Sequence, residues 1–83
     1  MTDAVITILY FARIAELTGV RTERLAAEGI SSGHALLQAL KVRHPALADV
    51  NNLRLAINQT HAPAGAAIAA GDEVAVFEPV TGG

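Results

Sequence analysis

The stretch Val5-Ile6-Thr7-Ile8-Leu9-Tyr10-Phe11 decides how the rest of this chain is interpreted. β-Branched and aromatic residues, which favour extended backbone, fill most of it, and nearly every position is apolar. A strand that is apolar on both faces is typical of the middle of a sheet. The sequence therefore predicts a central strand here, buried on both sides.

A second apolar stretch, Glu73-Val74-Ala75-Val76-Phe77, follows the turn residues Gly71-Asp72 and predicts a last strand buried beside the first. Four further elements are expected between the two stretches. They are a short helix over residues 12–18 ended by Gly19, a half-exposed strand over 21–26, a main helix that begins after Ser31-Ser32 and stops before Pro45, and a strand over 53–57 that the turn Asn58-Gln59 joins to a weak, Ala-rich strand.

This order of elements predicts an α+β fold, in which a mixed sheet packs on one main helix and carries a second, short helix. One sheet with its first and last strands side by side in the middle is the β-grasp, or ubiquitin-like, plan. We expect residues 1–78 to form this single domain and residues 79–83 to form a separate tail.

Composition limits the function. The 83 residues include no cysteine, which excludes disulfides, iron–sulfur clusters and Cys-ligated zinc. The hydrophobic fraction of 52% is high for so small a domain and suggests an apolar patch left exposed for a partner. Leu55, Ile57 and Val76 are our candidates for that docking patch, on the exposed side of the sheet. The alternative is that all three face the helix.

Charge and hydropathy argue against two classes of partner, nucleic acids and membranes. The net charge is −2 and the six basic residues are scattered, so we expect no nucleic-acid partner. No apolar run approaches the roughly 18 residues of a membrane span, and residues 1–4 have no positive leader. We therefore expect no membrane partner and a cytoplasmic location.

The end of the chain carries the expected chemistry. It reads Glu78-Pro79-Val80-Thr81-Gly82-Gly83, and Pro79 cannot continue the sheet. An extended chain from Pro79 onward reaches about 16 Å, at roughly 3.3 Å per residue. The last two glycines have no side chains to collide with a narrow channel. The tail is thus suited to enter a partner's active site, although a functionless terminus is the alternative for a lone Gly-Gly.

A carboxylate at Gly83 has a pKa near 3.5, so at neutral pH it is an anion and a poor electrophile. Adenylation by an ATP-dependent partner would activate it, and sulfur from a persulfide would then convert it to a thiocarboxylate. The sulfur of that group is a nucleophile that can be passed on. No side chain of this protein need take part.

Other candidate sites are weaker. His34 and His44 are ten positions apart on one helix, roughly 80° around its axis, and cannot chelate one ion together. His61 has no second ligand at metal-binding spacing, so we expect no metal. Asp72 and Glu73 are adjacent on a strand and face opposite ways, which argues against a catalytic carboxylate pair.

The chain resembles the small subunit of molybdopterin synthase, the MoaD type of sulfur carrier, over nearly its whole length. Three blocks carry the resemblance: Leu9-Tyr10-Phe11-Ala12 with Glu16-Leu17-Thr18-Gly19, Ala56-Ile57-Asn58-Gln59-Thr60, and Gly71 to Gly83 with its ending Phe-Glu-Pro-Val-Thr-Gly-Gly. The family resemblance implies that Gly83 bears the thiocarboxylate and that Pro79, Val80, Thr81 and Gly82 enter the large subunit. That subunit holds the catalytic residues and adds two sulfurs to a cyclic pyranopterin precursor, which gives the dithiolene of molybdopterin.

On this interpretation the chain is not an enzyme by itself and binds no cofactor. Its partners are the large subunit, an ATP-dependent adenylating enzyme and a persulfide enzyme, and it works in a hetero-oligomer. Two positions depart from the family: Glu78 stands where a proline is frequent, and Ala15 where an arginine is common. The alternatives are a sulfur carrier for thiamine thiazole formation or tRNA thiolation, and a ubiquitin-like conjugating or binding module.

Overall fold

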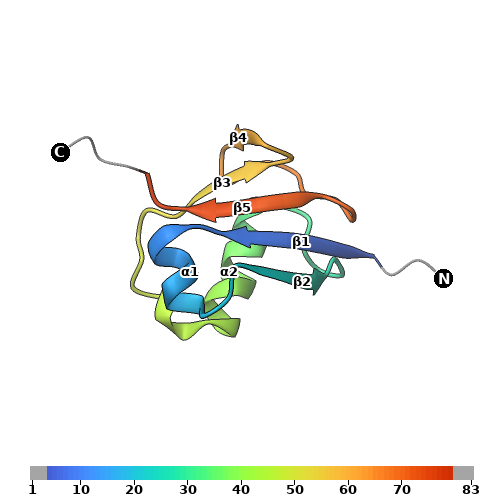
Figure 1. The fold of residues 1–83 in the computed structure, drawn as a ribbon. Helices are drawn as coiled ribbons and strands as arrows, with labels where there is room; N and C mark the ends of the chain where they lie inside the picture. Colours follow the sequence, from blue (N-terminus) through green and yellow to red (C-terminus); the bar gives the residue numbers. More distant parts are fainter. Residues whose placement is uncertain (1–3, 80–83) are drawn as a thin grey trace.

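A computed structural model describes residues 4–79 of the chain, which form five strands, two α-helices and one 3₁₀ turn (Figure 1). In chain order the elements are β1 (Val5–Tyr10), α1 (Ala12–Thr18), β2 (Thr22–Ala26), α2 (Gly33–Arg43), η1 (Pro45–Leu47), β3 (Arg54–Ile57), β4 (Thr60–Ala62) and β5 (Glu73–Phe77). The predicted order of elements is confirmed, and strand ends differ from expectation by one residue. The weak strand is Thr60–Ala62 alone; the Ala-rich stretch after it contributes a single bridge, from Ala67 to Ser32.

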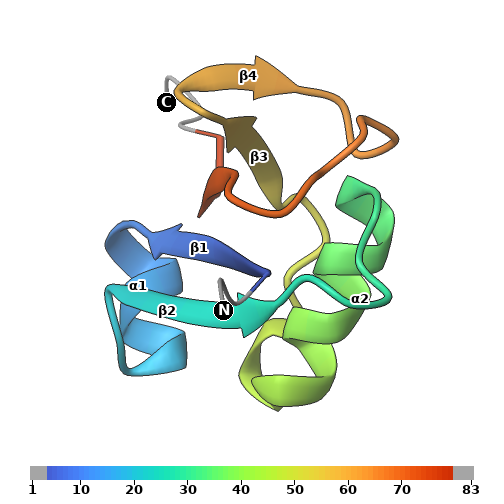
Figure 2. The same cartoon turned by 90° about the vertical axis from the view of Figure 1, so that its right-hand side faces the viewer.

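The strands make one mixed sheet in the order β2-β1-β5-β3-β4. β1 and β5 pair in parallel in its middle, with Tyr10 opposite Val76, and all other neighbours are antiparallel. The first and last strands are therefore adjacent, as the two apolar stretches predict. Figure 2 shows α2 packed along one side of this twisted sheet.

The core lies between the sheet and the helices. The side chains that are fully buried there come from every layer: Ile6, Ile8, Ile14, Leu36, Leu40, Leu47, Val74 and Val76. Burial of each such side chain stabilises the folded state by about 1.5–3 kcal/mol relative to an exposed one. Alternate residues of β1 and β5 supply this face, while their neighbours on the outer face stay half-buried. The prediction that the first strand is buried on both sides was therefore wrong, because helices cover only one face of the sheet.

Local signals set the helix ends. The Ser32 hydroxyl accepts a hydrogen bond from the Ala35 amide at 3.2 Å and caps α2, as predicted. Gly19 takes the left-handed conformation, with φ 81°, that ends α1. Asn58 and Gln59 both have positive φ, which is the backbone of a two-residue hairpin turn. Asp72 belongs to the neighbouring turn, where its carboxylate accepts hydrogen bonds from the Ala69 amide and the Asn58 side chain.

No helix in the stretch between residues 4 and 79 is both long and apolar enough to span a bilayer.

Candidate functional site

The two central strands end at the same edge of the sheet because they run in parallel. Phe11 follows β1 there, and Glu78 and Pro79 follow β5 (Figure 1). The predicted tail thus leaves the domain next to the start of α1. Pro79 is the one tail position within the described residues; Val80, Thr81, Gly82 and Gly83 lie outside them.

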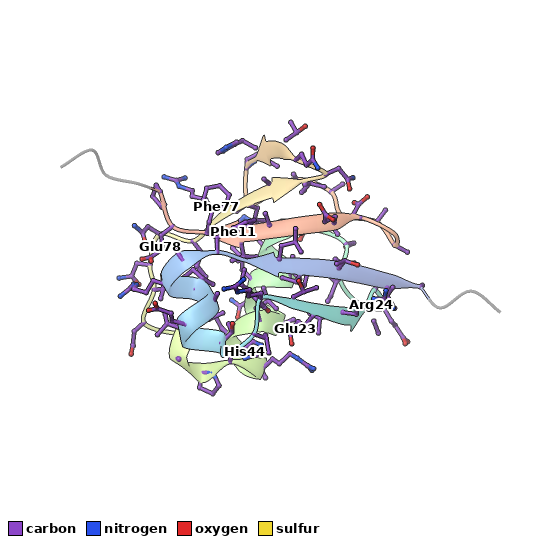
Figure 3. The ribbon with its side chains drawn as sticks, viewed as in Figure 1. Phe11, Glu23, Arg24, His44, Phe77 and Glu78 are labelled. Carbon is purple, nitrogen blue, oxygen red and sulfur yellow. The ribbon has the colours of Figure 1, made fainter. Side chains whose placement is uncertain are left out.

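An aromatic patch surrounds this exit on the outer face of the sheet. Phe77 follows the buried Val76 and so points outward, and Phe11 keeps an extended backbone that continues the alternation of β1. Phe11 is 51% exposed, and the His61 ring packs edge-on against Phe77 at 5.3 Å between centroids. Figure 3 shows Phe11, Phe77 and Glu78 close together at this end of the molecule. We call Phe11, His61 and Phe77 the outer-face patch.

Two open hollows flank the patch, and Phe77, Glu78 and Pro79 line both. The smaller one, ≈ 430 Å³, is completed by Phe11, Ala12 and Arg13. The larger one, ≈ 640 Å³, reaches His61 and Pro63 on the other side. A partner surface seated here would contact aromatic rings and the root of the tail at the same time.

The predicted docking patch was placed on the wrong face. Leu55 is only 2% exposed and Val76 is fully buried. Leu55 pairs with Val76 and Ile57 pairs with Val74, so the register turns all three candidates toward the helices. Ile57 is half-buried at the margin of the core. Leu55 and Val76 belong to the hydrophobic core and Ile57 packs against it, whereas Phe11 and Phe77 lie on the opposite face.

The first residue of α1 holds an unusual backbone. Ala12 has φ 48°, a left-handed conformation that costs a residue with a Cβ roughly 1–2 kcal/mol. Its neighbour Phe11 is extended and serves as the helix N-cap without any side-chain hydrogen bond. Non-glycine residues in this region cluster at functional sites. Here the strained turn lets the chain enter a helix directly after a strand, with Phe11 left exposed.

An ion pair joins α1 to the end of β5. Arg13 donates from Nε to Glu78 Oε1 at 2.9 Å and from Nη2 to Oε2 at 2.7 Å, which is the two-point fork that arginine forms with a carboxylate. Hydrogen bonding to Arg13 lowers the pKa of Glu78, and the same bonds raise the pKa of Arg13. Glu78, which departs from the family pattern, therefore has a partner in this chain.

A second polar cluster lies away from the tail (Figure 3). The Glu23 carboxylate accepts hydrogen bonds from the Tyr10 hydroxyl and from Arg43 Nε, and its Oε1 lies 2.6 Å from His44 Nε2. Burial acts to raise the pKa of Glu23, but the hydrogen bonds from Tyr10, His44 and Arg43 outweigh it and hold that pKa below its ordinary value. This cluster ties β1, β2 and the end of α2 together.

Two of the three histidines have side-chain contacts within the protein. His44 caps α2 and contacts Glu23, while His61 packs on Phe77. Within residues 4–79 no three His, Cys, Asp or Glu side chains are grouped as a metal site would need. His44 thus joins α2 to β2, and His61 belongs to the outer-face patch.

Comparison with known proteins shows the family to which the chain belongs. A family model described as the ThiS family matches residues 8–83. The chain belongs to the ThiS family. Among its relatives, the human molybdopterin synthase sulfur carrier subunit is 38% identical over 82 residues, which is 94% of this chain and 93% of that protein. The chain is thus a sulfur carrier of this small, single-domain type.

Solved structures of similar fold test the predicted architecture. Small archaeal modifier protein 1 from Haloferax volcanii superposes with a TM-score of 0.80 at 35% identity, over 95% of this chain and 99% of that one. In the complex of subunits 1 and 2 of molybdopterin-converting factor from Helicobacter pylori, one chain superposes with a TM-score of 0.65 at 18% identity, over 95% of this chain and 99% of that one. These neighbours of the ThiS-family chain confirm the predicted ubiquitin-like β-grasp fold.

Sequence reasoning missed three features of the site. The outer-face patch was detectable, because Phe11 and Phe77 each follow a residue that the strand pattern buries. The Arg13–Glu78 pair joins residues 65 positions apart and has no signal in a single sequence. The same holds for the cluster around Glu23, whose members lie on three separate elements.

Proposed function

We propose that this chain is the sulfur-donating small subunit of a molybdopterin synthase, and that the carboxylate of Gly83 is its working group. The observation that carries the proposal is similarity along nearly the whole chain to molybdopterin synthase sulfur carrier subunits, with a family match that extends to residue 83. The chain supplies sulfur and has no catalytic role by itself. It binds no cofactor, and its modification is a thiocarboxylate at Gly83.

Three partner proteins are needed, because a free carboxylate neither accepts nor donates sulfur by itself. An adenylating enzyme first joins the Gly83 carboxylate to AMP from ATP, with release of pyrophosphate, because the free anion is a poor electrophile. The terminal sulfur of an enzyme's persulfide then attacks the adenylated carbonyl and displaces AMP, which gives an acyl disulfide. A second thiol cleaves the S–S bond of that intermediate, forms a disulfide with the enzyme's sulfur and releases the thiocarboxylate. In the large subunit, the thiocarboxylate sulfur would attack the cyclic pyranopterin precursor, and water would then cleave the thioester that joins the two, which leaves the sulfur on the precursor and restores the Gly83 carboxylate. Two such transfers complete the dithiolene.

The outer-face patch is the docking surface in this proposal. Exposed aromatic residues are enriched at the centres of protein interfaces, and Phe11 is a large apolar side chain left half in water. Pro79 lies at the border of this surface, so a partner that covers the patch receives residues 79–83 directly. An extended tail from Pro79 reaches about 16 Å into that partner. Pro79, Val80, Thr81 and Gly82 would lie inside the partner's channel.

A second candidate function uses the same end of the chain. Small archaeal modifier protein 1 of Haloferax volcanii is 38% identical over 82 residues, equal to the identity with the human carrier subunit. As a modifier, the chain would be joined through Gly83 to lysine amines of other proteins. Adenylation is common to both roles, and the nucleophile that follows, sulfur or amine, separates them.

The test is the intact mass of the protein after incubation with its adenylating enzyme, ATP and a sulfur source. Replacement of one oxygen by sulfur in the full-length chain, and not in a version lacking Gly83, is the expected result. Transfer to the pyranopterin precursor is then followed with the large subunit present. An unchanged mass with an active partner enzyme contradicts the proposal, and isopeptide-linked products in extract would favour the modifier role instead.

A further inference from the structure

Just after β5 ends, the chain is fixed by a side-chain contact and no longer by the backbone pairing of the sheet. The last ladder pair of β5 joins Phe77 to Arg54, and Pro79 has no amide hydrogen to donate. Glu78 lies between them, and its carboxylate is gripped at both oxygens by Arg13 of α1. Within residues 4–79 this fork is the side-chain contact that continues the order of the sheet past its last strand.

Fixing Glu78 also fixes the residue that follows it. A residue before proline is confined to extended backbone, and the proline ring locks φ near −65°. With the Glu78 side chain held by Arg13, few backbone rotations remain between the sheet and Pro79. The direction in which the chain leaves the domain is therefore set at Glu78.

Arg13, the other member of the ion pair, is also held in place by its backbone. Arg13 follows Ala12, whose left-handed backbone begins α1 immediately after β1. This geometry keeps Arg13 on the first turn of the helix, where it lines the same hollow as Phe11, Glu78 and Pro79. The strained residue thus places the exposed aromatic ring and the arginine in one hollow beside the exit.

We propose that Arg13 and Glu78 are positioning residues that aim the C-terminal tail, so that the tail points into a partner's active site when the outer-face patch docks. This inference rests on the proposed function. It deepens that function by assigning a role to Glu78, the position where this chain departs from its family. The pair also neutralises Glu78, which would otherwise be an unpaired carboxylate at the border of an apolar contact.

The first measurement needs no partner. Backbone ¹⁵N relaxation of the Glu78 amide is compared in the native chain, in Arg13→Gln and in the control Arg24→Gln, which removes the same charge from an exposed arginine at the far end of the sheet (Figure 3). We expect an order parameter near that of rigid backbone, about 0.85, in the native chain and the control, and a value below about 0.6 in Arg13→Gln. An unchanged value in Arg13→Gln overturns the proposal.

The second measurement is steady-state adenylation of the full chain. Arg13→Gln and Glu78→Gln should each raise KM by roughly two- to five-fold with kcat unchanged, the size expected for an exposed ion pair. The exchanged double variant Arg13→Glu/Glu78→Arg should recover most of the loss. If the exchange is no better than the worse single variant, each residue acts separately and the proposal fails.

The two measurements separate this inference from the function on which it rests. If the native chain is never adenylated by an active enzyme, the proposed function fails, while the relaxation of the Glu78 amide still decides whether Arg13 fixes that residue. If the native chain is adenylated and the variants match it in KM and in relaxation, the function stands and the positioning role is lost.

Discussion

Oε1 of Glu23 on β2 lies 2.6 Å from Nε2 of His44 at the C-terminal cap of α2. The contact links the edge of the sheet to the end of the main helix, and the Tyr10 hydroxyl and Arg43 complete it. The Glu23 side chain is only 13% exposed, so its charge is well shielded from water. Its removal is therefore expected to affect stability more than the loss of a surface carboxylate.

Glu23→Gln should lower the free energy of unfolding at pH 7 by about 1–3 kcal/mol, because three donors lose a charged acceptor. The pKa of Glu23 is lowered in the folded chain, so its stabilisation is present above the unfolded value of about 4.3 and is lost as pH falls below it. Urea unfolding at pH 7 and at pH 3 measures this. The exposed Glu16→Gln is the matched control, and an equal loss in both variants would contradict the prediction.

Tyr10, the single tyrosine of the chain, should resist ionisation while the protein is folded. Burial, followed by the hydrogen bond to Glu23, raises its pKa above the ordinary value of about 10. Its stabilisation is therefore full below about pH 10 and declines as pH rises further. Absorbance of tyrosinate should appear only together with loss of circular dichroism.

The same titration in denaturant is the control for Tyr10, and it should show ionisation near pH 10. Tyrosinate that appears near this pH while the circular dichroism stays native would show that the hydroxyl is free of Glu23.

Gly33→Ala should destabilise the protein although alanine favours helices. A Cβ at Gly33 would meet the Ala64 carbonyl oxygen and lie 2.6 Å from Leu55 Cδ1, and the backbone of residue 64 cannot move as a side chain can. We expect a loss of about 1–3 kcal/mol, typical of overpacking. Thermal unfolding measures it. Gly65→Ala, where a Cβ meets nothing within 4 Å, should leave stability nearly unchanged.

Leu55 and Phe11 should respond oppositely to truncation. Leu55→Ala removes a buried side chain and should cost about 2–5 kcal/mol of stability. Phe11→Ala removes an exposed ring, so the fold should stay intact while affinity for the large subunit falls by more than tenfold, as for a hot-spot aromatic. Denaturation and titration calorimetry give the two values.

The result for Phe11 tests the docking surface directly. If Phe11→Ala binds the large subunit as tightly as the native chain, the outer-face patch is not the interface. If Leu55→Ala keeps its stability and loses binding, Leu55 contributes to docking and not to the core.

The sequence by itself determined the elements, their order and the central pairing of the first and last strands. These follow from local preferences and from the period of apolar residues, which a single stretch such as Val5–Tyr10 displays. It also predicts chemistry at the end of the chain, from residue type alone, and that remains a prediction because residues 80–83 lie outside the described part of the structure. The resemblance of the Phe-Glu-Pro-Val-Thr-Gly-Gly ending pointed to the family before any fold was known.

Only the tertiary structure decided which face of the sheet is exposed and which distant residues meet. Alternation along β3 and β5 and the pairing of the two strands put Leu55 and Val76 on one face of the sheet, but only the packing of the helices decides that this face is the buried one. Arg13 reaches Glu78 because two parallel strands end side by side, a relation between residues 65 positions apart. Local sequence encodes conformation along the chain, whereas contacts across it depend on how the elements pack.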